Sequence, residues 1–226
     1  MSRSIKLPFS DKYDEQHSQQ YLTKHKQGLW RRMSHQRDIA IGRKALERAG
    51  NPQSVLDLPC GAGRFWPMLA EQPGRRIIAA DNSSDMLATA RKAQPADVVA
   101  RVTTMQTSVF AIDLADKAVD SVFCMRLLHH IGSAEHRMAM LHELHRVSRD
   151  SVIVSLWVDG NFKSWRRKRL ERKRDQDPSW KAQQNRFVLP AITAEAEFRA
   201  AGFTVQDKLD FLPGYAMWRV YVLRKK

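Results

Sequence analysis

Asp57, Gly61, Gly63 and Asp81 have the residue types and the spacing of a nucleoside-binding turn. A short apolar run ends in Asp57 and is followed at once by the two glycines, whose missing Cβ atoms let the backbone approach a ligand closely. Asp81 ends the next apolar run, 20 residues after Gly61, where an acid commonly holds ribose hydroxyls. The pattern predicts a ligand site at the carboxyl edge of a parallel sheet.

Position 66 indicates which nucleoside the turn accepts. A dinucleotide fold uses the pattern GxGxxG, and counting from Gly61 its third glycine would fall at Trp66. An indole there would crowd a pyrophosphate over the helix N-terminus. An adenosine without a phosphate does not need that space, and S-adenosylmethionine is the obvious ligand of this kind.

Three segments in order resemble the motifs of class I S-adenosylmethionine-dependent methyltransferases, in particular the methyltransferase type 11-like branch with an LHH signature. They are the turn 57–63, the segment 81–87, and 120–131 with Leu128-His129-His130 near its end, and the resemblance covers residues 51–156. It implies an α/β, Rossmann-like fold with a mostly parallel seven-stranded sheet, an antiparallel last strand and helices on both faces. It also implies S-adenosylmethionine as cofactor and S-adenosylhomocysteine as product.

Spacing and resemblance together nominate the residues that contact the cofactor. Pro59 stands where the family more often has glycine, and Ser108 stands near where many members have an acid. An arginine of the N-terminal segment, Arg32, is a candidate partner for the cofactor's carboxylate, with a solvated helix face as the alternative. The full set is Asp57, Pro59, Cys60, Gly61, Gly63, Asp81, Asn82, Met86, Ser108, Val109, Met125 and Arg32.

His129 and His130 are the only candidates for a catalytic base that the motifs nominate. A histidine beside a hydroxyl acceptor could take its proton. The alternative is a structural or orienting role, which the resemblance favours because the LHH signature occurs in relatives with different substrates. An amine or ring nitrogen acceptor would need no base, and methyl transfer requires no metal.

The charge balance favours an anionic partner. The chain has 38 basic and 24 acidic residues, a formal net charge of +14, although basic surface that only confers solubility is an alternative. An insertion at 159–190 concentrates the charge, with eight cations and one acid between Lys163 and Arg174, and Phe162, Trp165 and Trp180 interleave it with rings. Alone, such a segment is expected to be a solvated or partly disordered arm. The predicted acceptor-binding residues are Arg126, Trp165, Arg166, Arg169 and Tyr215.

The 226 residues suit one domain at 51–226 that carries the insertion, preceded by a helical N-terminal lid at 1–50. Expected strands are 55–58, 77–80, 98–105, 120–125, 151–157, 205–209 and 217–223; expected helices are 64–71, one begun by Ser83 or Ser84, 133–149, and 193–201 capped by Thr193. Cys60 and Cys124 should lie near the cofactor without forming a disulfide. The lack of a signal peptide core or transmembrane segment predicts a cytoplasmic protein.

These features predict a methyltransferase that acts on an oxygen or nitrogen atom of an anionic acceptor, either a phosphorylated sugar, a glycolipid or tRNA. Two other hypotheses remain open. One is a non-catalytic module that binds S-adenosylmethionine and serves a partner, and the other is a methyltransferase of neutral small molecules whose surface is incidentally basic. A peripheral membrane contact is compatible with the charge, and the oligomeric state is not predicted.

Overall fold

The computed structural model describes residues 5, 29–174 and 184–226, and its centre is a seven-stranded sheet. The strand order is β3-β2-β1-β4-β5-β7-β6. Neighbouring strands from β3 to β5 are parallel, and β7 runs antiparallel to both β5 and β6. This confirms the predicted sheet. The strands are β1 (Ser54–Asp57), β2 (Arg76–Asp81), β3 (Val102–Gln106), β4 (Val119–Cys124), β5 (Ser148–Trp157), β6 (Phe203–Asp210) and β7 (Trp218–Lys225).

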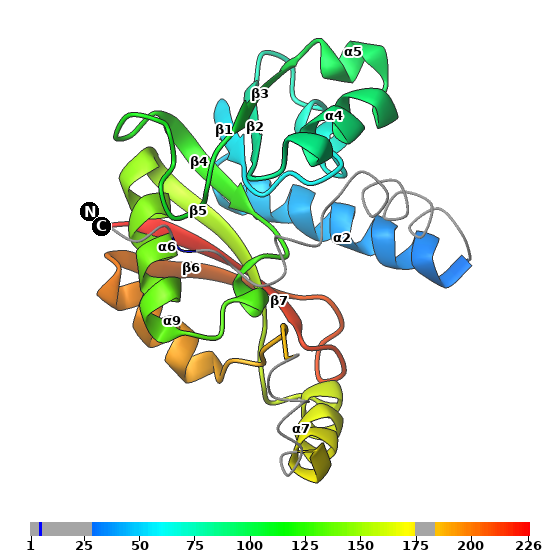
Figure 1. Cartoon of the computed structure of the whole chain (residues 1–226), viewed down its shortest axis with the longest axis vertical. Coiled ribbons are helices and arrows are strands. Elements are labelled where there is room, and N and C mark those ends of the chain that lie inside the picture. Colours follow the sequence, from blue (N-terminus) through cyan, green and yellow to red (C-terminus); the bar gives the residue numbers. More distant parts are fainter. Residues whose placement is uncertain (1–4, 6–28, 175–183) are drawn as a thin grey trace.

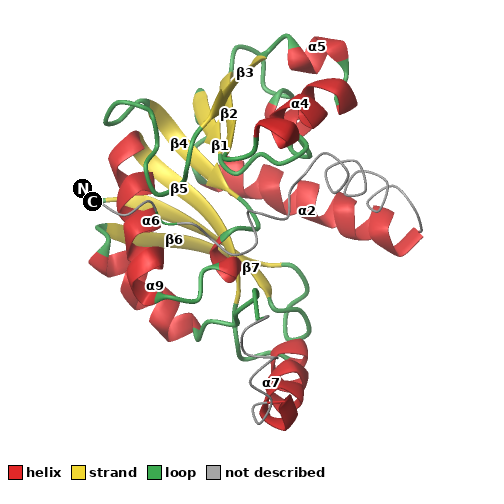
Figure 2. Cartoon of the chain, viewed as in Figure 1, coloured by secondary structure: helices red, strands yellow, loops and turns green. Residues whose placement is uncertain are grey.

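Helices cover both faces of the sheet, as Figures 1 and 2 show with α6 and α9 in front of it and α2 passing behind. The described helices are α2 (Leu29–Arg48), α3 (Trp66–Leu69), α4 (Ser84–Ala93), α5 (Ala96–Val99), the 3-10 turn η2 (Leu128–His130), α6 (Ala134–Val147), α7 (Phe162–Arg174) and α9 (Ala191–Ala200).

The central strands alternate their side chains between two apolar cores. Val152 and Val154 of β5 pack on the α6 and α9 side, whereas Ile153 packs on the α2 side. Ile41 and Ala45 of α2 join that second core. The described half of the predicted lid is therefore one layer of the folded core; residues 1–4 and 6–28 lie outside the described residues.

The structure corrects three predicted elements. The expected strand at 98–105 is wrong in its first half, because Pro95 begins the short helix α5 and the strand starts at Val102. The β-branched pair at 98–99 had suggested a strand, but burial of Val98 against α3 and α4 favours the helix. The helix expected at 64–71 is reduced to α3, and α9 begins after Pro190, so Thr193 is not its cap.

Residues 162–174 of the basic insertion form the helix α7, whose side chains are mostly exposed, so this part is a solvated arm and not a disordered one. Asn161 caps α7, since its side-chain oxygen accepts a hydrogen bond from the backbone nitrogen of Ser164 at 2.9 Å. Figure 1 shows α7 projecting at one end of the molecule. Residues 175–183, including Trp180, lie outside the described residues.

Candidate cofactor and acceptor site

The glycine turn after β1 is fastened to the end of β2 by Asp81. One carboxylate oxygen of Asp81 accepts a hydrogen bond from the backbone nitrogen of Gly61 at 2.9 Å, and the other accepts one from Ser83 at 3.0 Å. Cys60 donates its backbone hydrogen to the carbonyl of Ala80 at 2.8 Å. Burial raises the pKa of Asp81 while these backbone donors lower it. Each carboxylate oxygen retains a lone pair for a ligand hydroxyl.

Gly61 and Gly63 are each required to be glycine, but for different structural reasons. Both have positive φ, at 52° for Gly61 and 72° for Gly63. A Cβ on Gly61 would meet open space, so this glycine keeps the turn accessible to a ligand. A Cβ on Gly63 would lie 2.9 Å from the Trp66 ring and 3.0 Å from Gln94, so this glycine is required by packing.

Asp57, at the end of β1, is a fully buried carboxyl group whose polar neighbour is the indole of Trp66. Burial, and next to it the charge of Asp81, raise the pKa of Asp57 well above its ordinary range. The buried indole of Trp66 offsets part of this rise, because its interaction with the carboxyl group lowers the pKa of Asp57. A buried carboxyl in this state suits a ligand that brings a positive charge or hydrogen-bond donors.

Asp38 of α2 joins the glycine turn to the end of β4. It is buried, lies 2.5 Å from the guanidinium of Arg64 just after the turn, and also pairs with Arg126 just after β4. Arg64 donates as well to Nδ1 of His35 at 2.9 Å, and burial together with Arg64 lowers the pKa of His35. Arg126 has a left-handed φ of 64°, a strained conformation of the kind found at binding sites.

Arg32 does not join this cluster. Its side chain is exposed near the beginning of α2, and Figure 1 shows that end of the helix projecting away from the sheet. The predicted cofactor residue Met125 is buried and lines a small pocket together with Asp38, Arg126, Ser155 and Trp218.

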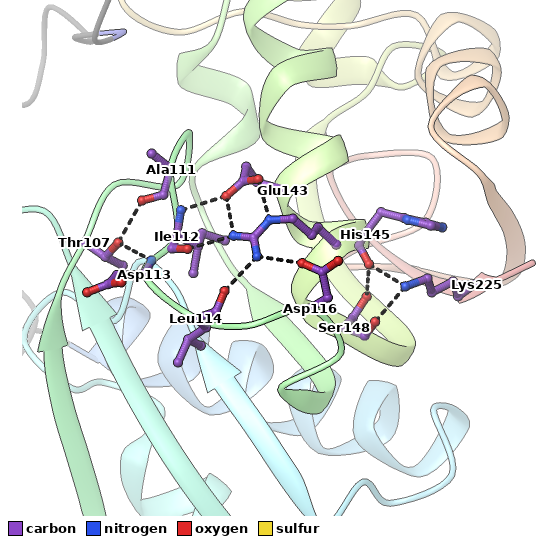
Figure 3. Close-up of polar contacts among 11 residues, drawn as sticks. Thr107, Ala111, Ile112, Asp113, Leu114, Asp116, Glu143, His145, Ser148 and Lys225 are labelled. Carbon is purple, nitrogen blue, oxygen red and sulfur yellow. Dashed lines mark hydrogen bonds and ion pairs between the residues drawn. The ribbon is translucent and has the colours of Figure 1, made fainter. Parts of the chain in front are cut away.

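The loop after β3, which contains Ser108 and Val109, is fixed by α6. Arg146 donates to the carbonyls of Ile112 and Leu114 at 2.7 Å each, and Glu143 accepts from the backbone nitrogen of Ile112 at 2.7 Å. Figure 3 shows these groups with the hydrogen bonds of Thr107 inside the loop. Val109 is buried, and the Ser108 hydroxyl accepts from the backbone nitrogen of Phe110 at 3.2 Å.

The remaining predicted cofactor residues frame the same edge of the sheet. Asn82 follows Asp81 and is exposed, with its carbonyl accepting from Gln106 at 3.0 Å. Met86 is buried on α4. Pro59 follows Leu58 through a cis peptide bond in the turn, and Cys60 is a buried free thiol whose pKa is raised by burial.

His129 lies in a ring-lined cage at the carboxyl ends of β4 and β5. Its ring is stacked 4.9 Å from Trp157 and meets Trp218 edge-on at 4.7 Å. Only 5% of the residue is exposed, and its Nδ1 has no partner among the described residues. Burial, followed by nearby His130 and three arginines, lowers the pKa of His129 to about 2, so the ring is neutral at physiological pH.

Three guanidinium groups surround this cage. Arg126 lies 4.8 Å from the centre of the Trp218 ring, while Arg167 and Arg186 lie 4.9 Å and 5.8 Å from that of Trp157. The indole nitrogen of Trp157 is buried and unpartnered among the described residues. Arg126 is paired with Asp38 and Arg167 with Glu171, so the three cations exceed these acids by one, and this surplus charge beside the ring nitrogens suits an anionic group.

The segment 184–190 returns along β5 and closes one side of the cage. Phe187 donates its backbone hydrogen to the carbonyl of His129 at 2.7 Å, and Leu189 does the same to Trp157 at 2.9 Å. Nδ1 of His130 lies 2.6 Å from the carbonyl of Asn185. The second histidine of the signature is therefore engaged by the end of the insertion.

The structure brings together only part of the predicted acceptor set. Arg126 belongs to the cage, whereas Trp165, Arg166 and Arg169 are exposed on α7, and Tyr215 is exposed on the neighbouring turn. Sequence reasoning did not single out Asp38, Arg64, Trp157, Arg186 or Trp218 for these roles. Trp157 carried one usable signal, because it ends a parallel strand at the edge where ligands bind.

The described residues contain neither a metal-binding cluster nor a membrane-spanning helix. Within residues 29–174 and 184–226, no group of three or more His, Cys, Asp or Glu side chains is placed to hold a metal ion. No helix in the described part of the chain combines the length and apolarity needed to cross a bilayer.

Comparisons with known proteins agree with the geometry of the glycine turn. Residues 55–151 match the family model described as a methyltransferase domain. An uncharacterised methyltransferase-like protein of Schizosaccharomyces pombe is 32% identical over 93 residues, which is 41% of this chain and 33% of that protein. A malonyl-[acyl-carrier protein] O-methyltransferase of Pectobacterium atrosepticum is 29% identical over 132 residues, 54% of this chain and 47% of that protein. The chain thus matches a third to a half of the length of these relatives.

Solved structures share the whole fold. The magnesium protoporphyrin IX methyltransferase of Synechocystis with bound SAH superposes with a TM-score of 0.73 at 20% identity, covering 96% of this chain and 97% of that one. The [4+2]-cyclase SpnF gives a TM-score of 0.63 at 15% identity, covering 83% and 81%. The second likeness is to a protein named for a different reaction, so the fold by itself does not fix the chemistry.

Proposed function

We propose that this chain, whose residues 55–151 form a class I S-adenosylmethionine-dependent methyltransferase domain, transfers the methyl group of S-adenosylmethionine to an oxygen or nitrogen atom of an anionic acceptor. The observation that carries the acceptor class is the convergence of Arg126, Arg167 and Arg186 on the cage around His129. A phosphorylated sugar, a glycolipid and tRNA all offer the phosphate chemistry that such a site would bind.

The residues of the glycine turn fit the cofactor. Asp57 offers a buried carboxyl group, Asp81 offers free lone pairs beside Gly61, and Gly61 leaves open space where a side chain would stand. Asp81 would hold the ribose hydroxyls, and Asp57 would compensate positive charge. When bound, S-adenosylmethionine supplies a methyl group that its positively charged sulfur makes electrophilic.

The chain's own contribution is then positioning and exclusion of water. Arg126, Arg167 and Arg186 would orient the acceptor's anionic group, while Trp157 and Trp218 present dry ring surfaces beside it. His129 is a weak base with its pKa near 2, so its neutral ring serves better as an orienting hydrogen-bond partner than as a proton acceptor. The assignment of His129 and His130 as catalytic residues stays a prediction, as does the cytoplasmic location.

The first experiment measures S-adenosylmethionine and S-adenosylhomocysteine binding by calorimetry. Binding in the micromolar range is expected for a working methyltransferase. Absence of binding at millimolar cofactor would leave only a scaffold role. Turnover should be measured as well as binding, because a cyclase shares this fold.

The second experiment follows radiolabelled methyl transfer from S-adenosylmethionine to separate pools of tRNA, lipopolysaccharide, sugar phosphates and neutral phenols. We expect transfer to an anionic pool, weakened by salt, with Arg186→Gln raising the acceptor KM about tenfold and leaving cofactor affinity unchanged. Arg199→Gln, an exposed arginine on α9, is the matched control. Salt-independent transfer to the phenols alone would instead support a neutral acceptor.

A further inference from the structure

Helix α7 turns its polar side toward the protein and its rings toward solvent. Ser164 is buried and Arg167 and Glu171 are half-buried, and these three positions share one side of the helix. Arg167 and Glu171 form a 2.7 Å ion pair there. Phe162 and Trp165 on the opposite side are 50% and 54% exposed. This pattern is the inverse of a helix that packs its apolar side on its own domain.

The exposed rings of α7 continue onto the turn between β6 and β7. Tyr215 is stacked on Phe162 with ring centres 5.8 Å apart and planes 10° apart, and Trp165 lies 6.0 Å from Phe162. The backbone nitrogens of Phe162 and Lys163 donate to Gly214 and Tyr215 at 3.0 Å each, so turn and helix form one surface. Leu170 on the helix and Leu212 on the turn are also exposed, at 47% and 46%.

Cations lie against two of these rings, and further cations are exposed on the same helix. Lys163 lies 5.0 Å from the centre of the Tyr215 ring, and Arg169 lies 5.8 Å from that of Trp165. Arg166, Lys168 and Arg172 are exposed on the same helix, whose only acid, Glu171, is engaged by Arg167. Rings at the centre and arginines and lysines around them are the pattern of a helix that lies in the interface of an anionic bilayer.

We propose that the lipid-docking face, meaning the exposed side of α7 with the turn 211–217, binds the surface of an anionic lipid bilayer. The rings and the two leucines enter the headgroup region, and the cations meet lipid phosphates. A single-stranded nucleic acid would use the rings and the arginines but not the aliphatic Leu170 and Leu212, so the lipid surface accounts for more of this face. Figure 1 shows α7 at an extremity of the molecule, where a flat surface can reach it.

This inference does not depend on methyl transfer, although it would bring a membrane acceptor close to the cage. Arg167 sits on the inner side of the same helix and lies against Trp157. One helix would therefore contact the bilayer with one side and the acceptor site with the other.

The test is sedimentation of the full chain, without cofactor, with vesicles of phosphatidylcholine alone or mixed with phosphatidylglycerol. We expect binding to the mixed vesicles that falls with salt and is at least tenfold weaker on phosphatidylcholine alone. Phe162→Ala with Trp165→Ala, and separately Arg166→Gln with Arg169→Gln, should each weaken binding at least tenfold. All four side chains are exposed, and circular dichroism checks that the variants are folded.

The controls carry changes of the same kind elsewhere on the surface. Trp30→Ala removes another exposed indole, on α2, and Lys44→Gln with Lys92→Gln removes the same net charge from α2 and α4. Both should bind like the unchanged chain. The proposal would be overturned if the control and α7 variants lost equal affinity, or if the chain did not bind the mixed vesicles. It would also be overturned if tRNA displaced the chain from the vesicles while Phe162→Ala with Trp165→Ala left tRNA binding unchanged.

Discussion

Asp38 and Arg64 form a 2.5 Å ion pair that links helix α2 to the glycine turn, although the two residues come from opposite sides of strand β1 in the sequence. Arg126 pairs with the same carboxylate from the end of β4. A single buried acid thus connects the predicted cofactor turn with the guanidinium that borders the acceptor cage. Burying one acid between two arginines is favourable only while all three partners stay in place.

Asp38→Asn should weaken S-adenosylhomocysteine binding by roughly tenfold, because the neutral amide holds Arg64 less firmly beside the turn. Calorimetry measures the affinity, and circular dichroism confirms the fold. Glu71→Gln is the control. It breaks the exposed ion pair between Glu71 and Arg43, a residue of α2 like Asp38, and should leave cofactor affinity unchanged. Equal affinity for all three proteins would remove Asp38 from the site.

Gly61→Ala and Gly63→Ala should separate ligand access from packing. Gly61→Ala should cost about 1 kcal/mol of unfolding free energy from its positive φ, and should reduce cofactor affinity strongly. Gly63→Ala should cost about 2–4 kcal/mol because its Cβ meets the Trp66 ring. Urea unfolding gives the stabilities. A larger stability loss for Gly61→Ala would contradict this division.

Asp57→Asn should stabilise the cofactor-free protein while weakening cofactor binding. The folded-state pKa of Asp57 is raised, so the folded chain binds more protons than the unfolded chain as pH rises above the ordinary value of 3.8. Asp57 therefore costs stability progressively as pH increases through that window, by at most about 1.4 kcal/mol per pH unit. Thermal unfolding of both proteins from pH 4 to pH 8 should show the variant's advantage growing with pH; a constant difference would count against it.

His129→Phe should make the protein more resistant to acid. The pKa of His129 is lowered to about 2, so its contribution is fully present above about 6.5 and is lost as pH falls toward 2. The unchanged protein should lose up to about 1.4 kcal/mol per pH unit relative to the variant in that window. Unfolding at pH 7, 6 and 5 measures this, with exposed His142→Gln as the control. Parallel pH curves would show that His129 does not titrate abnormally.

Arg146→Leu should loosen the loop that carries Ser108 and Val109. Its guanidinium holds two carbonyls of that loop, so about 2 kcal/mol of unfolding free energy should be lost. Hydrogen exchange should rise at 107–114, and the affinity for S-adenosylhomocysteine should fall several-fold because this loop is predicted to contact its adenine. Arg149→Leu is the control, because Arg149 pairs with Asp120 and reaches Lys117 rather than the loop at 107–114. Unchanged exchange at 107–114 would mean that β3 and α6 hold the loop without it.

The sequence by itself determined the parallel sheet, the glycine turn and the placing of Asp57 and Asp81 at its edge. These features depend on short-range patterns: an apolar run long enough for a strand, glycines where φ must be positive, and an acid at the end of the next strand. The local sequence pattern predicted secondary structure less reliably where the burial of a side chain favoured a different element. The valines at 98–99 suggested a strand, but they form a helical turn that buries Val98 beside Trp66 and Leu87.

Only the tertiary structure decided which arginines serve the site. Arg166 and Arg167 are adjacent in the sequence, yet one faces solvent and the other lies on Trp157, because a helix turns by about 100° per residue. Asp38 and Arg126 are 88 residues apart and meet because α2 packs against the sheet. Spacing along the chain fixes a turn, whereas the pairing of distant side chains follows from how whole layers pack.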